Sequence, residues 1–239
     1  MIIIGTTNLL KDILSKENII KNISIDGPAA SGKTSLGQEL SKRINYKFLD
    51  TGLMYRFVAY QSIIMNVDSS NEESIVNVSK KLEISSFDLL DGEVHLNSKN
   101  VTSKLKERRV DRRVSQIAKY SNVRKILVDH QRDIALRNNL VMVGRDIGTV
   151  VLPNADYKFY ITANPEIRAK RRYKDLAELK TQISFEDILQ EIKERDNTDS
   201  MRDDSPLIPA IDAIIIDTSR IDFENSILKI MEFIEGEQI

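Results

Sequence analysis

The residues best suited to chemistry form one glycine-bounded segment, Gly27-Pro28-Ala29-Ala30-Ser31-Gly32-Lys33-Thr34. It matches the pattern G-x-x-x-x-G-K-[ST] and lies between a predicted strand and a predicted helix, the context that this pattern requires. The glycines allow a tight turn whose N–H groups reach phosphate oxygens, and the N-terminus of the following helix faces the same anion. The alternative is a glycine-rich turn with an exposed lysine.

The end of this segment is suited to a nucleoside triphosphate. Lys33 offers a positive charge to the β and γ phosphates of ATP, and the Thr34 hydroxyl can reach the Mg²⁺ ion that bridges them. We therefore expect an ATP site that contains Gly27, Pro28, Ala29, Ala30, Ser31, Gly32, Lys33, Thr34 and Ser35, with Thr34 as the metal ligand. A phosphate loop alone does not separate a kinase from a motor, a GTPase or a binding module.

Four further segments carry arginines or carboxylates. They are Leu49-Asp50-Thr51-Gly52-Leu53-Met54-Tyr55-Arg56, Ser115-Gln116-Ile117-Ala118 with Val123-Arg124, Gly144-Arg145-Asp146-Ile147-Gly148-Thr149-Val150-Val151, and Glu194-Arg195-Asp196-Asn197-Thr198-Asp199-Ser200-Met201-Arg202. The Asn-Lys-x-Asp segment with which GTPases read guanine does not occur in the sequence. Short arginine-containing motifs thus recur at several places after the phosphate loop.

In order and over about Ile19 to Glu235, these motifs resemble the bacterial cytidylate kinase (CMP/dCMP kinase) family of P-loop nucleoside monophosphate kinases. The resemblance implies an α/β P-loop kinase fold: a parallel sheet flanked by helices, with a small strand-rich insertion on the nucleotide side and a helical lid. It also implies transfer of the γ-phosphoryl group of ATP to CMP or dCMP, giving ADP and CDP or dCDP.

The resemblance places nine residues at the acceptor nucleotide: Thr51, Arg56, Ser115, Arg124, Arg145, Asp146, Arg195, Asp199 and Arg202. It implies that three of the arginines, Arg56, Arg145 and Arg202, hold the acceptor phosphate together with Thr51. It implies that Arg195 and Asp199 contact the ribose.

The remaining three positions, Ser115, Arg124 and Asp146, are implied to read cytosine. A carboxylate accepts from the exocyclic amine, whereas arginine and serine donate to the ring nitrogen and the carbonyl. For catalysis we expect Lys33, Arg145 and a lid arginine, Arg171 or Arg172, that arrives when the lid closes. An acceptor phosphate is already a nucleophile near neutral pH, so no Ser-His-Asp arrangement is needed.

Two positions depart from the family pattern. Val143 stands where members often carry an acidic residue before Gly-Arg-Asp, which removes a carboxylate that could position a magnesium-bound water. Thr198 stands where some relatives carry arginine. Two alternatives stay open. A P-loop kinase for another small acceptor is one, because the donor loop does not identify the acceptor. The other is a nucleotide-binding regulatory module without turnover, suggested by Val143 and the amino-terminal extension.

Hydrophobic patterns predict the elements that position these residues. Strands are expected at Ile19–Ile25, Tyr46–Leu49, Leu140–Val143, Lys158–Ile161 and Ala213–Ile216. Helices are expected from Lys33, over Leu53–Met65, through Val110–Arg137 and over Pro165–Arg195, followed by a polar break at Asn197–Pro209. The strand-rich insertion is expected at 82–101, with Asp91-Gly92 as its hairpin turn. The lid covers about 168–202 within a kinase domain at 19–239, and 1–18 forms an amino-terminal extension.

Composition limits the function classes. The chain has 239 residues, 35 Lys and Arg against 36 Asp and Glu, and no cysteine. A balanced charge disfavours nucleic acid and anionic membranes as partners, and the absence of cysteine excludes disulfides and thiolate metal sites. The first segment lacks the features of a signal peptide or membrane span. We expect a cytoplasmic monomer whose partners are small nucleotides.

Several of these residues also have structural interpretations. Asp50 and Thr51 could simply cap the second helix. Arg145-Asp146 could form a surface salt bridge, although a charged pair directly after a buried strand is typical of a cleft. The basic run Lys104–Arg113 contains acidic residues and is interpreted as a solvated helix face. No role is assigned to His95 or His130.

Overall fold

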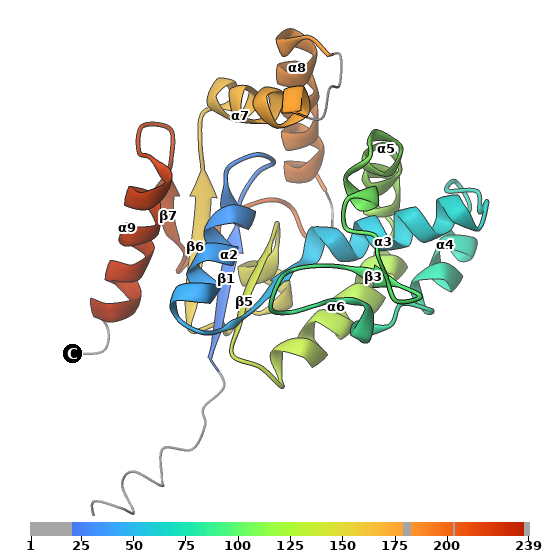
Figure 1. Ribbon diagram of the computed structural model, residues 1–239, viewed down its shortest axis with the longest axis horizontal. Coiled ribbons are helices and arrows are strands. Elements are labelled where there is room, and N and C mark those ends of the chain that lie inside the picture. Colours follow the sequence, from blue (N-terminus) through green and yellow to red (C-terminus); the bar gives the residue numbers. More distant parts are fainter. Residues whose placement is uncertain (1–20, 179–182, 203, 237–239) are drawn as a thin grey trace, which may run out of the picture.

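A five-stranded parallel sheet in the order β2-β5-β1-β6-β7 forms the centre of the protein (Figure 1). The computed structural model describes residues 21–178, 183–202 and 204–236. Its strands are β1 (Asn22–Asp26), β2 (Lys47–Asp50), β5 (Leu140–Gly144), β6 (Tyr157–Thr162) and β7 (Ile214–Asp217). The predicted parallel sheet is confirmed, and all five expected strands are present, four of them within one residue of both predicted ends. Residues 1–18 and the first residues of the expected strand at Ile19 lie outside the described residues.

Helices cover both faces of the sheet. One face carries α2 (Lys33–Arg43) and α9 (Phe223–Gly236), and the other carries α3 (Thr51–Ile64) and α6 (Ser121–Ala135) (Figure 1). Successive residues of β5 point to opposite faces, so Val141 and Val143 pack on the α2 side and Leu140 and Met142 on the α3 side. A strand buried on both faces needs a continuous apolar run, which is why β5 could be predicted.

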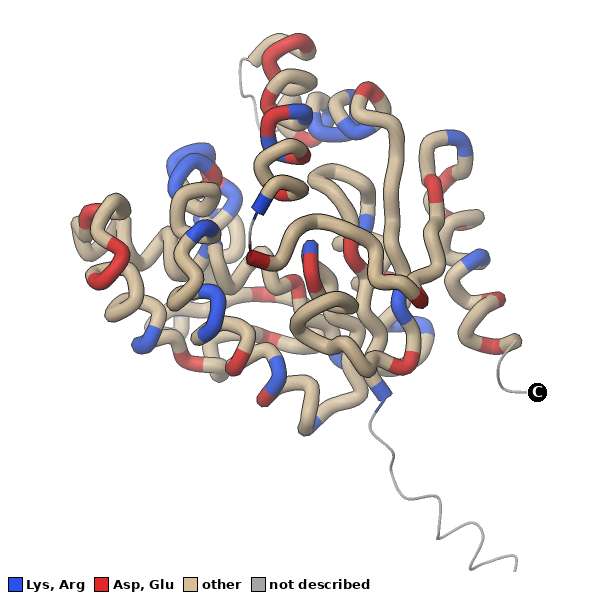
Figure 2. The backbone as a smooth tube through the Cα atoms, turned by 180° about the vertical axis from the view of Figure 1, so that it is seen from behind, with Lys and Arg blue, Asp and Glu red and all other residues tan. Residues whose placement is uncertain are grey.

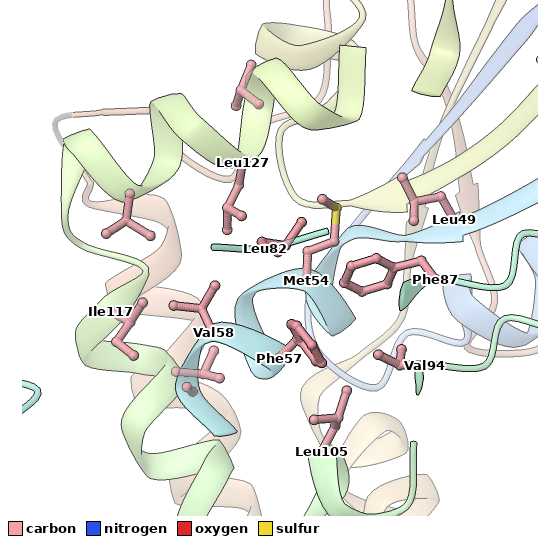
Figure 3. Close-up of a cluster of buried hydrophobic side chains, with 14 of the residues drawn as sticks. Leu49, Met54, Phe57, Val58, Leu82, Phe87, Val94, Leu105, Ile117 and Leu127 are labelled. Carbon is pink, nitrogen blue, oxygen red and sulfur yellow. The ribbon is translucent and has the colours of Figure 1, made fainter. Parts of the chain in front are cut away.

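The larger apolar cluster joins α3 to α4 (Glu72–Ser79), α5 (Arg108–Ile117) and α6 (Figure 3). Phe57 of α3 meets Phe87 edge to face, with ring centroids 5.5 Å apart. The helix α4 and the carboxyl-terminal α9 were not predicted. The single helical stretch expected over Val110–Arg137 is two helices, because the chain turns at 118–120 between α5 and α6.

The 82–101 segment lies against this cluster through Phe87 and Val94, which form an isolated bridge. It contains β3 (His95–Leu96), β4 (Lys99–Asn100) and the short helix η1 (Ile84–Ser86), so most of the segment is turn, less strand-rich than expected. The tight hairpin turn is Asn97-Ser98, both with positive φ (50° and 63°), as a type I′ turn requires. Asp91-Gly92 belongs instead to the wider loop before Val94, with Gly92 at φ 69°.

Two charged helices, α7 (Pro165–Glu178) and α8 (Phe185–Ser200), occupy the region that was expected to act as a lid, and we call them the lid helices. They pack on each other through the buried residues Ala169, Leu176, Ile188 and Ile192, and Figure 2 shows acidic and basic positions interspersed along them. The polar break predicted from Asn197 was placed too early, because α8 continues to Ser200. No described helix is long and apolar enough to cross a membrane.

Candidate functional site

The phosphate loop connects β1 to α2 at the carboxyl edge of the sheet. Gly27 has φ 150°, and a Cβ atom there would lie 2.0 Å from the Ile161 carbonyl oxygen, so only glycine fits. Gly32 has φ 94° and precedes the first residue of α2. The loop therefore has the backbone conformation that the two glycines of the motif were expected to provide.

Lys33 and Thr34 begin α2 at the mouth of this loop. Lys33 is buried, and its Nζ donates to the Pro28 carbonyl oxygen at 3.0 Å. Burial, together with the nearby Arg145, holds the pKa of Lys33 well below its usual value. The Thr34 hydroxyl lies 3.1 Å from Oδ2 of Asp50, at the end of β2. The loop thus brings an amine, a hydroxyl and a carboxylate together.

A cavity of about 770 Å³ opens beside the loop, between the carboxyl ends of β2 and β5, helix α5 and the lid. All nine residues expected at the acceptor line it: Thr51, Arg56, Ser115, Arg124, Arg145, Asp146, Arg195, Asp199 and Arg202. Lys33, Thr34 and Arg172 line the same cavity. These residues come from segments that are up to 169 positions apart (202 minus 33), and the fold brings them together.

One corner of the cavity contains a buried ion pair. Arg124 Nη2 lies 2.6 Å from Asp146 Oδ2, and both side chains are at most 10% exposed. Burial raises the pKa of Asp146, while Arg124 and Arg202 oppose that rise. The Tyr55 ring lies against Arg124, with the guanidinium carbon 5.9 Å from the ring centroid. Sequence reasoning missed Tyr55, although it directly precedes Arg56 in a quoted motif.

Asp199 gathers the arginines of a second corner. Its carboxylate is 3.0 Å from Arg145 Nε, pairs with Arg202 and lies 4.0 Å from Arg195 Nε. Burial raises the pKa of Asp199, but the three arginines outweigh burial and leave the pKa below its usual value. The pair Arg145–Asp146 is therefore no surface salt bridge, because each residue has its own partner inside the cavity.

Asp111 of α5 joins two further arginines. One of its oxygens pairs with Arg56, and the other lies 3.0 Å from Arg172 Nη2 on α7. Arg56 also donates to the Leu105 carbonyl oxygen at 2.9 Å. Asp111 therefore links α3 and α5 to α7.

The two candidate lid arginines point to different places. Arg172 faces the 770 Å³ cavity, whereas Arg171 donates to the backbone oxygens of Ser31 (3.1 Å) and Thr218 (2.8 Å). Arg171 lines a second cavity of about 440 Å³, together with Ser31, Gly32, Ser35 and other residues of the phosphate loop. Lys33 and Thr34 line both cavities.

Helix α3 begins at the site with a cap that sequence reasoning attributed to two candidates. Asp50 caps it by accepting from Gly52 N at 2.9 Å. The Thr51 hydroxyl instead donates to the Val143 carbonyl oxygen at 2.9 Å. Thr51 is thus a cavity-lining residue that also ties α3 to β5.

Asp26 was missed because its partners are backbone groups. Its two oxygens accept from Ile147 N (2.8 Å) and Gly148 N (2.7 Å), at the start of the π-helical turn η3 (Ile147–Val151). Burial raises the pKa of Asp26 to about 6. Because Asp26 directly precedes the phosphate loop, it fixes the Gly-Arg-Asp segment relative to that loop.

Arg168 was also missed, since nothing in the sequence separates it from the other lid arginines. It is 3% exposed, donates to Ala163 O (2.8 Å) and Ala29 O (3.1 Å), and pairs with Asp196 at 2.6 Å. One side chain therefore connects β6, the phosphate loop and both lid helices.

Arg168→Ala should lower the free energy of unfolding by about 3 kcal/mol or more, because it leaves Asp196 and two carbonyl groups unpaired. Urea unfolding would measure this, with Lys174→Ala on the exposed face of α7 as the control. Equal midpoints for the two variants would show that the Arg168 contacts contribute no net stability.

Known proteins resemble this chain over most of its length. A family model described as cytidylate kinase matches residues 23–236. The cytidylate kinase of Caldanaerobacter subterraneus subsp. tengcongensis is 42% identical over 218 residues, covering 91% of this chain and 96% of the relative. That of Alkaliphilus oremlandii is 38% identical, covering 90% and 97%. A solved structure of an uncharacterized protein from Eubacterium ventriosum aligns with a TM-score of 0.51 at 11% identity over 91% and 99%, which shows likeness of fold alone.

Proposed function

Because the chain belongs to the cytidylate kinase family, we propose that it transfers the γ-phosphoryl group of ATP to CMP or dCMP, giving ADP and CDP or dCDP. The observation that carries this proposal is a single cavity whose wall contains the phosphate loop at one side and the buried Arg124–Asp146 pair at the other. The phosphate loop is suited to a triphosphate. The Arg124–Asp146 pair is suited to a base that carries an amine next to a ring nitrogen that accepts a hydrogen bond.

The donor nucleotide is assigned to the phosphate loop and the second cavity. Lys33 lies where the two cavities meet, so the transferring phosphoryl group would pass beside its amine. The second cavity is also lined by Arg171, Ile221 and Phe223, whose guanidinium and apolar surfaces are suited to the adenine ring.

The acceptor phosphate is assigned to Arg56, Arg145 and Arg202, beside Thr51. Arg202 Nε is buried without a hydrogen-bond partner among the described residues. The same is true of Arg124 Nε, in the corner that contains the Arg124–Asp146 ion pair. A buried donor without a partner is costly, and a bound nucleotide would satisfy both groups. Arg195 and Asp199 are assigned to the ribose.

Cytosine is assigned to Ser115, Arg124 and Asp146. Asp146 uses one oxygen, Oδ2, for Arg124, and its second carboxylate oxygen can accept from the exocyclic amine. Arg124 and the hydroxyl of Ser115 donate to the ring nitrogen and the carbonyl. Uracil presents a carbonyl where cytosine presents the amine, so the Asp146 carboxylate would face another acceptor.

Mg²⁺ fits the oxygen groups at the mouth of the loop, Thr34 Oγ1 and Asp50 Oδ2, which are hard ligands of the kind it prefers. In the sheet Asp50 lies directly beside Val143, so Asp50 supplies a carboxylate next to the position where relatives often carry one. Held there by Thr34 and Asp50, the ion would supply positive charge that offsets the charge developing on the transferring phosphoryl group. No group of three His, Cys, Asp or Glu in the described part of the chain could hold a metal, so the phosphates would provide most of its ligands.

The protein contributes to this reaction mainly by positioning the two substrates and by stabilising negative charge. The acceptor phosphate oxygen must attack in line at the γ-phosphorus, and two polyanions repel each other unless cations lie between them. Lys33, Arg145 and Arg172 line the cavity in which the two substrates would meet, and the lid over it would exclude water. One chain supplies every one of these residues, which supports a monomer. The absence of cysteine and the use of ATP support a cytoplasmic location.

The proposal is tested by measuring ADP formation with CMP, dCMP, UMP and AMP as separate acceptors. We expect the highest kcat/KM with CMP or dCMP. Faster turnover of another acceptor would favour the first alternative, a kinase of different specificity. ATP binding by calorimetry without turnover of any acceptor would instead favour the regulatory module.

A further inference from the structure

Three of the described aspartates that line the 770 Å³ cavity, Asp111, Asp146 and Asp199, contact arginines there and differ in one respect. Asp146 and Asp199 have parts of the acceptor nucleotide to bind in the proposed function. Asp111 has none, yet it contacts Arg56 and Arg172, two arginines assigned to phosphate groups. In the sequence, Asp111 is one of the acidic residues that interrupt the basic run Lys104–Arg113.

The geometry of Asp111 imitates that of a bound anion. Its side chain is 19% exposed and directs one oxygen at Arg56 and the other at Arg172. A phosphate group presents arginine with the same pair of charged oxygens. Because Arg56 comes from α3 and Arg172 from α7, the carboxylate also bridges the acceptor side and the lid.

We propose that Asp111 is a positioning residue that occupies Arg56 and Arg172 until an acceptor phosphate displaces it. This inference rests on the proposed function for the identity of the acceptor. Arg56 stays in place during the exchange, because its Nη1 donates to the Leu105 carbonyl oxygen independently of Asp111. Among the described residues, the Arg172 guanidinium bonds to Asp111 and to no other group, so displacement of Asp111 frees it to reach the transferring phosphoryl group.

This arrangement has two consequences. The negative charge of Asp111 opposes binding of a phosphate but not of an uncharged nucleoside. It also keeps Arg172 away from ATP while the acceptor position is empty, which limits transfer of the γ-phosphoryl group to water. In that side reaction a water oxygen bonds to the γ-phosphorus, the bond to the β-phosphate bridging oxygen breaks, and the products are ADP, phosphate and a proton.

Asp111→Asn tests the inference, because it removes the charge and keeps the shape of the side chain. By calorimetry we expect the dissociation constant for CMP to fall by about fivefold or more, the shift that roughly 1 kcal/mol produces. Cytidine, which lacks the phosphate, should bind as it does to the wild type. Hydrolysis of ATP without an acceptor should rise several-fold.

Glu107→Gln is the matched control. Glu107 is the other acidic residue of the same basic run and pairs with Arg109 at 2.7 Å, but it lines neither cavity and contacts neither Arg56 nor Arg172. Its replacement should leave CMP affinity and ATP hydrolysis unchanged. Asp111→Ser provides a second variant that also lacks the charge, should the asparagine variant not fold.

Unchanged or weaker CMP binding by folded Asp111→Asn would overturn the inference, as would equal tightening of CMP and cytidine. Inorganic phosphate tests the same competition without a nucleobase. It should bind to Arg56 and Arg172 more tightly in Asp111→Asn than in the wild type, because the competing carboxylate is absent. If the wild type neither binds nor phosphorylates CMP, the proposed function fails, and the phosphate titration still decides the role of Asp111.

Discussion

Replacing Lys33 with methionine should lower kcat by about a hundredfold or more, the size of effect seen when a transition-state electrostatic contact is lost. The Lys33 amine lies at the junction of the two cavities and reaches the Pro28 carbonyl oxygen across the loop. Methionine keeps the length and apolar stem of the side chain but carries no charge. The loop backbone should therefore keep its shape while the transferring phosphoryl group loses its cation.

The fold should tolerate this change well. Burial already disfavours the charge of Lys33, which is why its pKa is lowered, so the neutral side chain removes a cost of folding. We expect an equal or higher melting temperature for Lys33→Met. Lys42→Met, at an exposed position of the same helix, is the control for both activity and melting. Near-normal turnover with unchanged melting would show that this loop is not the donor site.

Local sequence patterns predicted the sheet and the phosphate loop well. The strands are short apolar runs, and four of the five end at glycine or aspartate. The continuous apolar character of the central strand β5 indicates burial on both faces. The loop depends on Gly27 and Gly32, whose backbone angles other residues rarely adopt. Both features are determined within a few residues, which is why one sequence was sufficient.

Partners that are distant in sequence were not predictable in the same way. The resemblance named nine acceptor residues, and the fold brings them to one cavity, but it did not indicate which charges pair. Asp111 looked like part of a solvated helix face. On α5 its neighbours Arg108 and Arg109 are indeed 41% and 55% exposed, whereas Asp111 turns toward the lid. Its partners come from α3 and α7, and no local pattern records them.

The polar residues near the end of α8 illustrate the same limit. Their composition predicted a break from Asn197, and this was wrong because the helix reaches Ser200. Asp199 is buried there, since Arg145 and Arg202 supply the charges that water would otherwise supply. A charged residue indicates an exposed loop only where no partner of opposite charge is available to pair with it in the interior.

The choice of base depends on Asp146, and Asp146→Asn should reduce kcat/KM for CMP by about a hundredfold or more while changing that for UMP little. Asparagine is preferable to alanine, because alanine would leave the buried Arg124 charge unpaired and destabilise the fold. The amide presents N–H donors where the carboxylate only accepts. Two donors would then face each other when cytosine is bound, whereas the carbonyl of uracil can accept from the amide.

The measurement is the ratio of kcat/KM for CMP to that for UMP, taken for the wild type, Asp146→Asn and Arg56→Lys. The Arg56 variant should lower kcat/KM for CMP and for UMP by a similar factor, because a phosphate contact does not depend on the base. The Asp146 variant should narrow the ratio, because only one of the two bases offers the amine that the carboxylate accepts. If Asp146→Asn remains folded and lowers kcat/KM for CMP and UMP by the same factor, Asp146 acts on the phosphate or the metal. The assignment of cytosine to this corner of the cavity is then wrong.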